Sequence, residues 1–133
     1  MTSGQERIIT MKTTDFAKWK ERETEYKCHG GEGPYLITNM IKDMDKQYVK
    51  FIHDDIIPPH STFGNHFHRS ETPVEEFYYC VSGQGSMYLD GEWRDFLPGD
   101  ISVCRAGGEH GLVNTSETED LRIIVIYASA LEA

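Results

Sequence analysis

The sequence lacks long hydrophobic runs: no stretch approaches the roughly 18 apolar residues that a membrane-spanning helix needs. The first residues, MTSGQERIITMKTTDF, contain no apolar segment of the kind found in signal peptides. Cysteine is also scarce, since Cys28, Cys80 and Cys104 form an odd set without paired spacing. Such a set does not build a disulfide framework and is typical of a reducing compartment. We therefore expect a cytoplasmic protein without a membrane span.

Basic residues are in the minority. The chain has 13 Lys and Arg against 22 Asp and Glu, which gives a formal net charge of -9. Nucleic-acid phosphates require a basic binding face, and anionic membrane surfaces attract basic segments. We therefore expect neither nucleic acid nor membrane as a partner. The length of 133 residues suits a single domain.

Helical periodicity is nearly absent after Pro34. Short runs rich in aromatic and β-branched residues alternate with turn signals such as Asp90-Gly91 and Pro98-Gly99. This pattern predicts an antiparallel sandwich or barrel. The expected strands cover residues 34–41, 47–57, 61–68, 74–82, 86–90, 92–96, 101–105, 107–114 and 121–128.

The N-terminal part does not show this pattern of strands and turns. We therefore divide the chain into a peripheral arm, residues 1–33, and one domain, residues 34–133. Asp15 is a suitable cap for a short helix over FAKWKERE, in which Phe16 and Trp19 would share one face. We expect this helix or arm to lie against the outside of the domain or against a partner subunit.

The segment from Gly64 to Gly83, GNHFHRSETPVEEFYYCVSG, contains the strongest chemical signal. A strand projects alternate side chains to one face, so His66 and His68 should aim two imidazoles the same way. Two imidazoles near a carboxylate form a metal site. Glu76 is the preferred carboxylate, with Glu71 and Glu75 as rivals.

A further imidazole, His110, lies in a second glycine-rich segment, RAGGEHGLVN. Three neutral nitrogens and one carboxylate would hold one divalent transition metal and leave positions open for a substrate. We do not expect His53 or His60 to be ligands, because His60 lies in the turn PPHS and His53 precedes the acidic pair Asp54-Asp55.

Together these residues resemble the two motifs of the cupin superfamily. The first motif places a glutamate and then a glycine after His-x-His, and the second places glycine, histidine and asparagine at fixed spacing. The resemblance covers roughly residues 47–127. The matching positions are His66, His68, Glu76 and Gly83 in the first motif and Gly107, His110 and Asn114 in the second.

Three departures from the cupin motifs are visible. Seven residues separate His68 from Glu76, Arg105 stands where the second motif has proline, and the first glycine comes two residues before His66. Glu76 remains the preferred ligand, because it begins the apolar strand FYYCV while Glu75 has the opposite parity. The inserted RSETPV would form a longer loop at the barrel mouth, where specificity often resides.

The resemblance implies an all-β, cupin-type antiparallel jelly-roll barrel. It also implies that His66, His68, Glu76 and His110 bind a divalent metal, with Fe, Mn, Ni, Zn, Co and Cu left open. Small cupins commonly pair through their sheets, so we expect a homodimer in which the N-terminal arm reaches the partner.

Two residues are candidates for a catalytic role. Tyr78 shares the face of Glu76 and could donate a hydrogen bond or a proton to a bound substrate, and the alternative is an aromatic side chain that fills the barrel. Arg105 could clamp a substrate carboxylate, and the alternative is a surface ion pair on a turn.

The resemblance finally implies a metal-dependent enzyme for a small oxygenated substrate. We expect dioxygenase-like oxidative chemistry first. The alternatives are a metal-dependent isomerase or lyase of a sugar or keto acid, and a non-catalytic cupin that only binds a small molecule. A single scaffold carries many reactions, so the fold does not decide among them.

Overall fold

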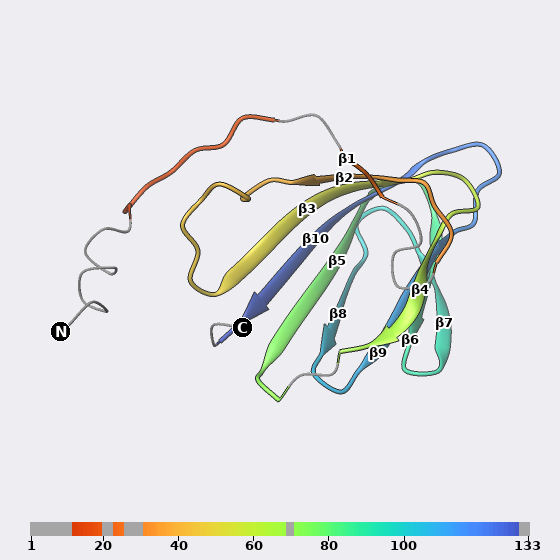
Figure 1. Cartoon of the computed structure of the whole chain (residues 1–133). Helices are drawn as coiled ribbons and strands as arrows, with labels where there is room; N and C mark the ends of the chain where they lie inside the picture. The colour runs from red at the N-terminus through yellow and green to blue at the C-terminus, as the bar shows by residue number, and fades with distance from the viewer. Residues whose placement is uncertain (1–11, 20–22, 26–30, 69–70, 131–133) are drawn as a thin grey trace.

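Two antiparallel sheets face each other in the computed structural model, which describes residues 12–19, 23–25, 31–68 and 71–130 (Figure 1). The six-stranded sheet has the order β1-β2-β3-β10-β5-β8, and the four-stranded sheet has the order β4-β9-β6-β7. This is the expected all-β jelly-roll architecture. The strands are β1 (Glu23–Glu25), β2 (Tyr35–Asn39), β3 (Val49–Ile57), β4 (Thr62–Phe67), β5 (Val74–Ser82), β6 (Gly85–Leu89), β7 (Glu92–Phe96), β8 (Ile101–Arg105), β9 (Glu109–Asn114) and β10 (Leu121–Ser129).

Alternating burial in the strands explains how the sheets pack. In β5 the side chains of Val74, Glu76, Tyr78 and Cys80 are buried, whereas those between them are more exposed. A strand projects successive side chains to opposite faces, so one face of β5 lies in the core. The β6–β7 hairpin turns at Asp90-Gly91, where both residues have positive φ, 46° and 95°, as a type I′ turn requires.

The apolar core fills the space between the two sheets and draws on both of them. Phe63, Met87 and Leu112 come from the four-stranded sheet, while Ile123 and Val125 come from β10 of the larger one. All five are at most 4% exposed. Burying a side chain of this size stabilises a fold by about 1.5–3 kcal/mol before the conformational entropy is subtracted.

A β-bulge interrupts the pairing of β4 with β9. Phe63 lies opposite Leu112, and His66 lies opposite His110, so three steps along β4 match two along β9. The extra residue reverses the parity of β4. As a result Phe63 and His66 both face the interior, although they are an odd number of residues apart.

The predicted helix over residues 16–23 is wrong in the part that the structure describes. Residues 16–19 have no regular structure, and Glu23 begins strand β1, which pairs with β2 at the edge of the larger sheet. The Asp15 carboxylate accepts a hydrogen bond from the adjacent Phe16 N–H and caps no helix. Phe16 and Trp19 are 80% and 68% exposed, and a short helix without a packed face is not stable.

Among the residues described here there is no helix at all, and therefore none that could cross a membrane. Cys80 and Cys104 are buried free thiols, while Cys28 lies outside the described residues. The division into an arm, 1–33, and a domain, 34–133, stays a prediction.

Candidate metal centre

His66, His68 and His110 come together where β4 and β9 lie side by side. His66 is the direct cross-strand partner of His110. His68 follows the end of β4, and its backbone continues the pairing, because its N–H donates to the Gly108 carbonyl and its carbonyl accepts from the Gly107 N–H. The pattern His-x-His therefore does aim both imidazoles at one place, as the strand parity predicts.

Glu76 reaches the same point from the opposite sheet. It is the third residue of β5, is 8% exposed and faces the barrel interior. One ligand atom from each of the four residues lies within 4.8 Å of the others. The structure thus brings together all four residues that the sequence singles out as metal ligands.

The distances among these donor atoms are short. His110 Nε2 lies 3.0 Å from His68 Nε2 and 3.1 Å from His66 Nε2. Glu76 Oε1 lies 3.1 Å from the Nε2 atoms of both His68 and His110. Lone pairs of bare nitrogens that face each other at this range repel, so the arrangement calls for a proton or a cation between them.

A divalent metal fits this donor set. Ligand atoms about 2.1 Å from a common ion and at right angles to one another lie about 3.0 Å apart, which matches the separations found here. Imidazole nitrogens with a single carboxylate oxygen suit divalent Fe, Mn, Ni, Zn, Co and Cu, so the donor chemistry does not choose one ion.

The Nδ1 atom of each histidine points away from the other donor atoms, and its hydrogen bonding shows how the ring is held in place. His66 Nδ1 lies 3.0 Å from the Gly64 carbonyl oxygen. Only a protonated nitrogen can donate to a carbonyl, so Nε2 is left to bind a metal. The Nδ1 atoms of His68 and His110 are buried and have no hydrogen-bond partner among the described residues. Packing against neighbouring side chains must orient these two rings.

The Glu76 carboxylate is ionised at neutral pH. Burial raises its pKa, but hydrogen bonds and positive charge from His110 and His68 outweigh burial and lower the pKa to about 2. A negative charge at this point matches a site for a cation, because it offsets part of the ion's charge inside the barrel.

The rival carboxylates do not join the cluster. Glu71 is exposed, and Glu75 lies on the opposite face of β5 from Glu76. The parity argument for Glu76 is therefore correct. The inserted RSETPV connects β4 to β5, and its residues 69–70 lie outside the described part of the chain, so its role in specificity stays a prediction.

Tyr78 faces inward next to the cluster. It is 3% exposed, and its ring centroid lies 4.8 Å from that of His110 and 6.3 Å from that of Phe63. The ring therefore packs between a metal-ligand candidate and the apolar core. This position agrees with a filling role and with a catalytic role, so proton donation by its phenol stays a prediction.

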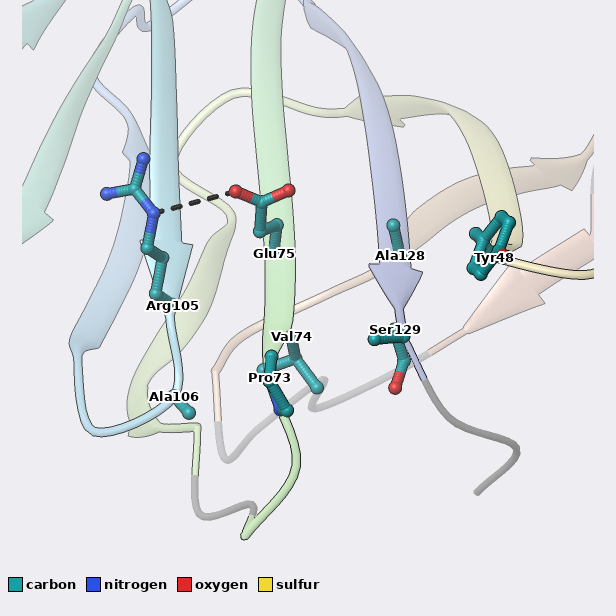
Figure 2. A pocket seen from close by; sticks show the side chains of 9 residues that line it. Tyr48, Pro73, Val74, Glu75, Arg105, Ala106, Ala128 and Ser129 are labelled. Carbon is teal, nitrogen blue, oxygen red and sulfur yellow. Dashed lines mark ion pairs between the residues drawn. The ribbon is translucent and has the colours of Figure 1, made fainter.

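Arg105 does not point toward the cluster. It pairs with Glu75 across β5 and β8, and its Nε lies 3.6 Å from a Glu75 carboxylate oxygen (Figure 2). Both side chains are well exposed, 67% and 50%. The cross-strand partner of Glu76 is instead Cys104. The structure thus contains the surface ion pair, the alternative that the sequence left open, and a carboxylate clamp by Arg105 stays a prediction.

The ion pair borders a groove at the end of the six-stranded sheet. Figure 2 shows Pro73 and Val74 below Glu75, with Ala128 and Tyr48 across the groove. The groove is mainly apolar and includes none of the four metal-ligand candidates. It is separate from the metal cluster.

Sequence reasoning missed the aromatic wall beside the cluster. Tyr127 is the β10 partner of Glu76, and its ring lies 6.3 Å from that of His68. Phe51 stacks on Tyr127 at 5.2 Å and on His53 at 4.3 Å. The signal available in the sequence was the alternation of β3 and β10, but alternation alone does not tell which face of a strand is inside.

Comparison with known proteins gives a family match. The family model described as Cupin domain matches residues 55–127. The curated "Oxalate-binding protein" of Thermotoga maritima is 27% identical to this chain over 100 residues, which make up 73% of this chain and 80% of that protein.

Solved structures agree on the fold. A crystal structure of a predicted oxalate decarboxylase from Thermotoga maritima has a TM-score of 0.73 and 23% identity, and the match covers 82% of this chain and 92% of that one. A sugar phosphate isomerase from Silicibacter pomeroyi has a TM-score of 0.60 and 17% identity, with coverage of 71% and 59%. At these identities the structural likeness establishes the fold alone.

Proposed function

The chain belongs to the cupin family, and from this premise we propose that it is a metal-dependent enzyme acting on a small oxygenated substrate. His66, His68, Glu76 and His110 are the proposed metal ligands. The observation that carries this proposal is the convergence of their four donor atoms within 4.8 Å, from strands of both sheets. One divalent transition metal, whose identity among Fe, Mn, Ni, Zn, Co and Cu is open, is the proposed cofactor.

A metal bound by these residues would supply Lewis acidity and polarise an oxygen of the substrate. The residues themselves hold the site in place. The Gly64 carbonyl fixes the tautomer of His66, and the ionised Glu76 supplies negative charge from the facing sheet. The His110 side chain is fully buried, so bulk water does not contact it.

Small carboxylates are the substrate class that we propose first. The relative from Thermotoga maritima is named for oxalate binding, and oxalate offers two adjacent oxygens that chelate one ion. Calorimetric titration of the metal-loaded protein with oxalate tests this choice. Saturable binding that disappears in the metal-free protein supports the proposal, whereas binding that is independent of metal contradicts it.

Dioxygenase-like oxidative chemistry remains the first reaction to test. We expect the iron-loaded protein to consume oxygen with one of a panel of diketones, catechols and hydroxy acids, measured with an oxygen electrode. His110→Ala should abolish the uptake, and His60→Asn is the matched control, because His60 is an exposed turn residue with φ of 63°. Uptake that persists in His110→Ala would contradict a role for the cluster.

Two alternatives predict other results. An isomerase or lyase would convert a sugar or keto acid without oxygen uptake, and it needs a residue that moves a proton. A non-catalytic cupin would release its ligand chemically unchanged. Mass analysis of ligand recovered after long incubation separates these alternatives, since only a binding protein returns the starting compound.

We also propose a homodimer that forms through the outer face of the six-stranded sheet. Phe77, Tyr79, Ile124 and Ile126 have the opposite parity to the core residues of β5 and β10, and they cover this outer face with apolar side chains. Ile101, beside Tyr79, is 62% exposed. A contiguous apolar face of this kind marks an interaction surface.

A second copy of this chain is the occupant that we propose for this face. The charged residues Glu75, Arg105, Asp54 and Arg122 are already paired within the chain, so the apolar side chains would make the contact, and a two-fold axis would place the same surface on both copies. We expect light scattering to give the mass of a dimer, and Ile101→Lys to give a monomer. Trp93→Lys, on the exposed part of β7, is the control that should stay dimeric.

A further inference from the structure

His53 and Asp55 project into the barrel from β3, although neither belongs to the metal cluster. His53 lies opposite Val125 and Asp55 lies opposite Ile123 on β10, and both partners are core residues. Directly opposed residues of an antiparallel pair project to the same face. His53 and Asp55 therefore both point inward, whereas Asp54, which lies between them in the sequence, points outward and pairs with Arg122.

A row of rings connects His53 with the cluster. The His53 ring stacks on Phe51 with centroids 4.3 Å apart, and Phe51 stacks on Tyr127 at 5.2 Å. Tyr127 in turn lies 6.3 Å from His68. His53 thus stands at the far end of the aromatic wall that begins at a metal-ligand candidate. Stacking on Phe51 fixes the plane of its ring.

Asp55 lies behind the His53 ring. The distance from His53 Nδ1 to Asp55 Oδ1 is 3.9 Å, which is longer than a hydrogen bond, and the contact is an ion pair only when His53 is protonated. The Asp55 side chain is 3% exposed, whereas that of His53 is 25% exposed. The carboxylate is therefore enclosed, while the histidine remains accessible. The ring nitrogen that is not turned toward Asp55 is Nε2.

The electrostatic setting keeps His53 neutral at pH 7. Burial lowers its pKa from the usual value, and the negative charge of Glu76 raises the pKa only in part. A neutral imidazole with a pKa below 6.5 can accept a proton at physiological pH.

We propose that His53, positioned by Asp55, is the proton-transfer residue for the reaction at the cluster of His66, His68, Glu76 and His110. This inference rests on the proposed function in its isomerase or lyase form, and it names the substrate class as a carbonyl compound or hydroxy acid with an acidic hydrogen. The bond to that hydrogen breaks, its electron pair stays on the substrate, and the proton bonds to His53 Nε2. The reverse step returns the proton to the substrate.

The assignment favours the isomerase or lyase alternative over oxidative cleavage. Such reactions depend on a residue that accepts a proton and gives it back, a role for which the sequence offered Tyr78 and for which Glu75 is the nearest other carboxylate to Glu76 along β5. Glu75 lies on the outer face of the sheet beside Arg105, so it cannot reach a substrate at the cluster. His53 is inside the barrel and accessible.

The tautomer of His53 tests the role of Asp55 without any substrate. In the metal-free protein labelled with ¹⁵N-histidine, we expect long-range NMR correlations to show His53 protonated on Nδ1, with the signal assigned by its loss in His53→Gln. Asp55→Leu removes the negative charge beside Nδ1, and the proton should then move to Nε2; Asp55→Asn, which also removes the charge, is the second variant in case leucine prevents folding. A wild-type ring protonated on Nε2, or a tautomer unchanged in both variants, would overturn the positioning role.

Deuterium exchange tests the proton transfer itself. The zinc-loaded protein is incubated in D₂O with pyruvate, 2-oxobutyrate or glycolaldehyde, and loss of the C–H signal is followed by NMR. We expect exchange that falls by about 100-fold or more in His53→Gln, with metal content unchanged, and that is retained in His60→Asn.

The outcomes separate this inference from the proposed function. A wild-type protein that binds zinc but exchanges none of the three compounds overturns the role of His53, as does equal exchange in His53→Gln. A wild-type protein that binds no metal overturns the proposed function instead, and the tautomer measurement then decides whether Asp55 positions His53.

Discussion

The two ends of the barrel interior differ in chemistry, although the same strands build both. At one end, near the start of β5 and the end of β4, the inward residues are His66, Glu76 and His110 (Figure 1). At the other end, a few residues away along the same strands, the side chains that point inward are those of Phe63, Cys80 and Leu112. The change from polar to apolar occurs within each strand and on one face.

This difference separates what stabilises the fold from what binds a ligand. The apolar end excludes water and supplies most of the hydrophobic free energy. The polar end gathers histidines and a carboxylate that, without a cation, bring little stability and carry the cost of burying polar groups. The strands are therefore a rigid support on which the metal-ligand candidates are placed at one end.

Leu112→Ala should have the largest effect on stability. Leu112 is fully buried at the apolar end of β9, two residues from His110. Its truncation leaves a cavity, so we expect the free energy of unfolding to fall by about 2–5 kcal/mol, measured by urea denaturation. The metal bound per folded chain should not change. A variant with normal stability but reduced metal would show that the two ends are not separable.

Gly111→Ala should disturb both ends, because Gly111 lies between them. A Cβ added at Gly111 would come 1.8 Å from the side-chain oxygen of Asn65 and 2.9 Å from Asn65 Cα. Asn65 belongs to the bulge that turns His66 inward. We expect a loss of about 1–3 kcal/mol in unfolding free energy together with weaker metal binding.

The double variant Gly111→Ala with Asn65→Gly is the control for this close contact. Removing the Asn65 side chain should restore part of the lost stability and part of the metal affinity. If Gly111→Ala alone binds metal as the wild type does, then the bulge does not determine the position of His66.

His110→Ala should act on the polar end alone. Loss of one ligand should lower metal affinity by about tenfold or more, measured by elemental analysis and by titration with zinc. The unfolding free energy of the metal-free protein should change less than in Leu112→Ala, because without a cation the His110 Nε2 atom faces the Nε2 atoms of His66 and His68 at a range where bare nitrogens repel. Full metal retention in both His66→Ala and His110→Ala would exclude these residues as ligands.

Arg105→Ala should have the smallest effect. Its ion pair with Glu75 is exposed and lies on the outer face, and exposed pairs contribute about 0–1 kcal/mol. We expect metal binding and oxalate affinity equal to those of the wild type by calorimetry. A marked loss of oxalate affinity would mean that Arg105 does reach the ligand.

Strand parity accounts for the part of the site that the sequence could predict. Because side chains alternate along a strand, the sequence predicted that His66 and His68 share one face and that Glu76, not Glu75, faces the interior. The structure agrees on both points. Asn114, the asparagine of the second motif, supports its turn, because its side chain donates to the Ile57 and Glu119 carbonyls and accepts from the Ser116 N–H.

Features that depend on pairing between distant strands could not be predicted. The bulge at residues 64–65 exists only relative to β9, and nothing within β4 marks the extra residue. His53 and Asp55 read as an ordinary polar stretch until β10 shows which face of β3 is inside. The sequence left two roles open for Arg105 for the same reason, since its face follows from its pairing with Glu75.

The metal content of the full chain tests the central claim most directly. The protein is purified without chelators, reconstituted separately with manganese, iron and zinc, and analysed for metal per chain. Convergence of His66, His68, Glu76 and His110 predicts one ion per chain with at least one of these metals, and a large loss in His110→Ala. Sub-stoichiometric metal that no reconstitution raises, or equal metal in wild type and His110→Ala, would contradict it.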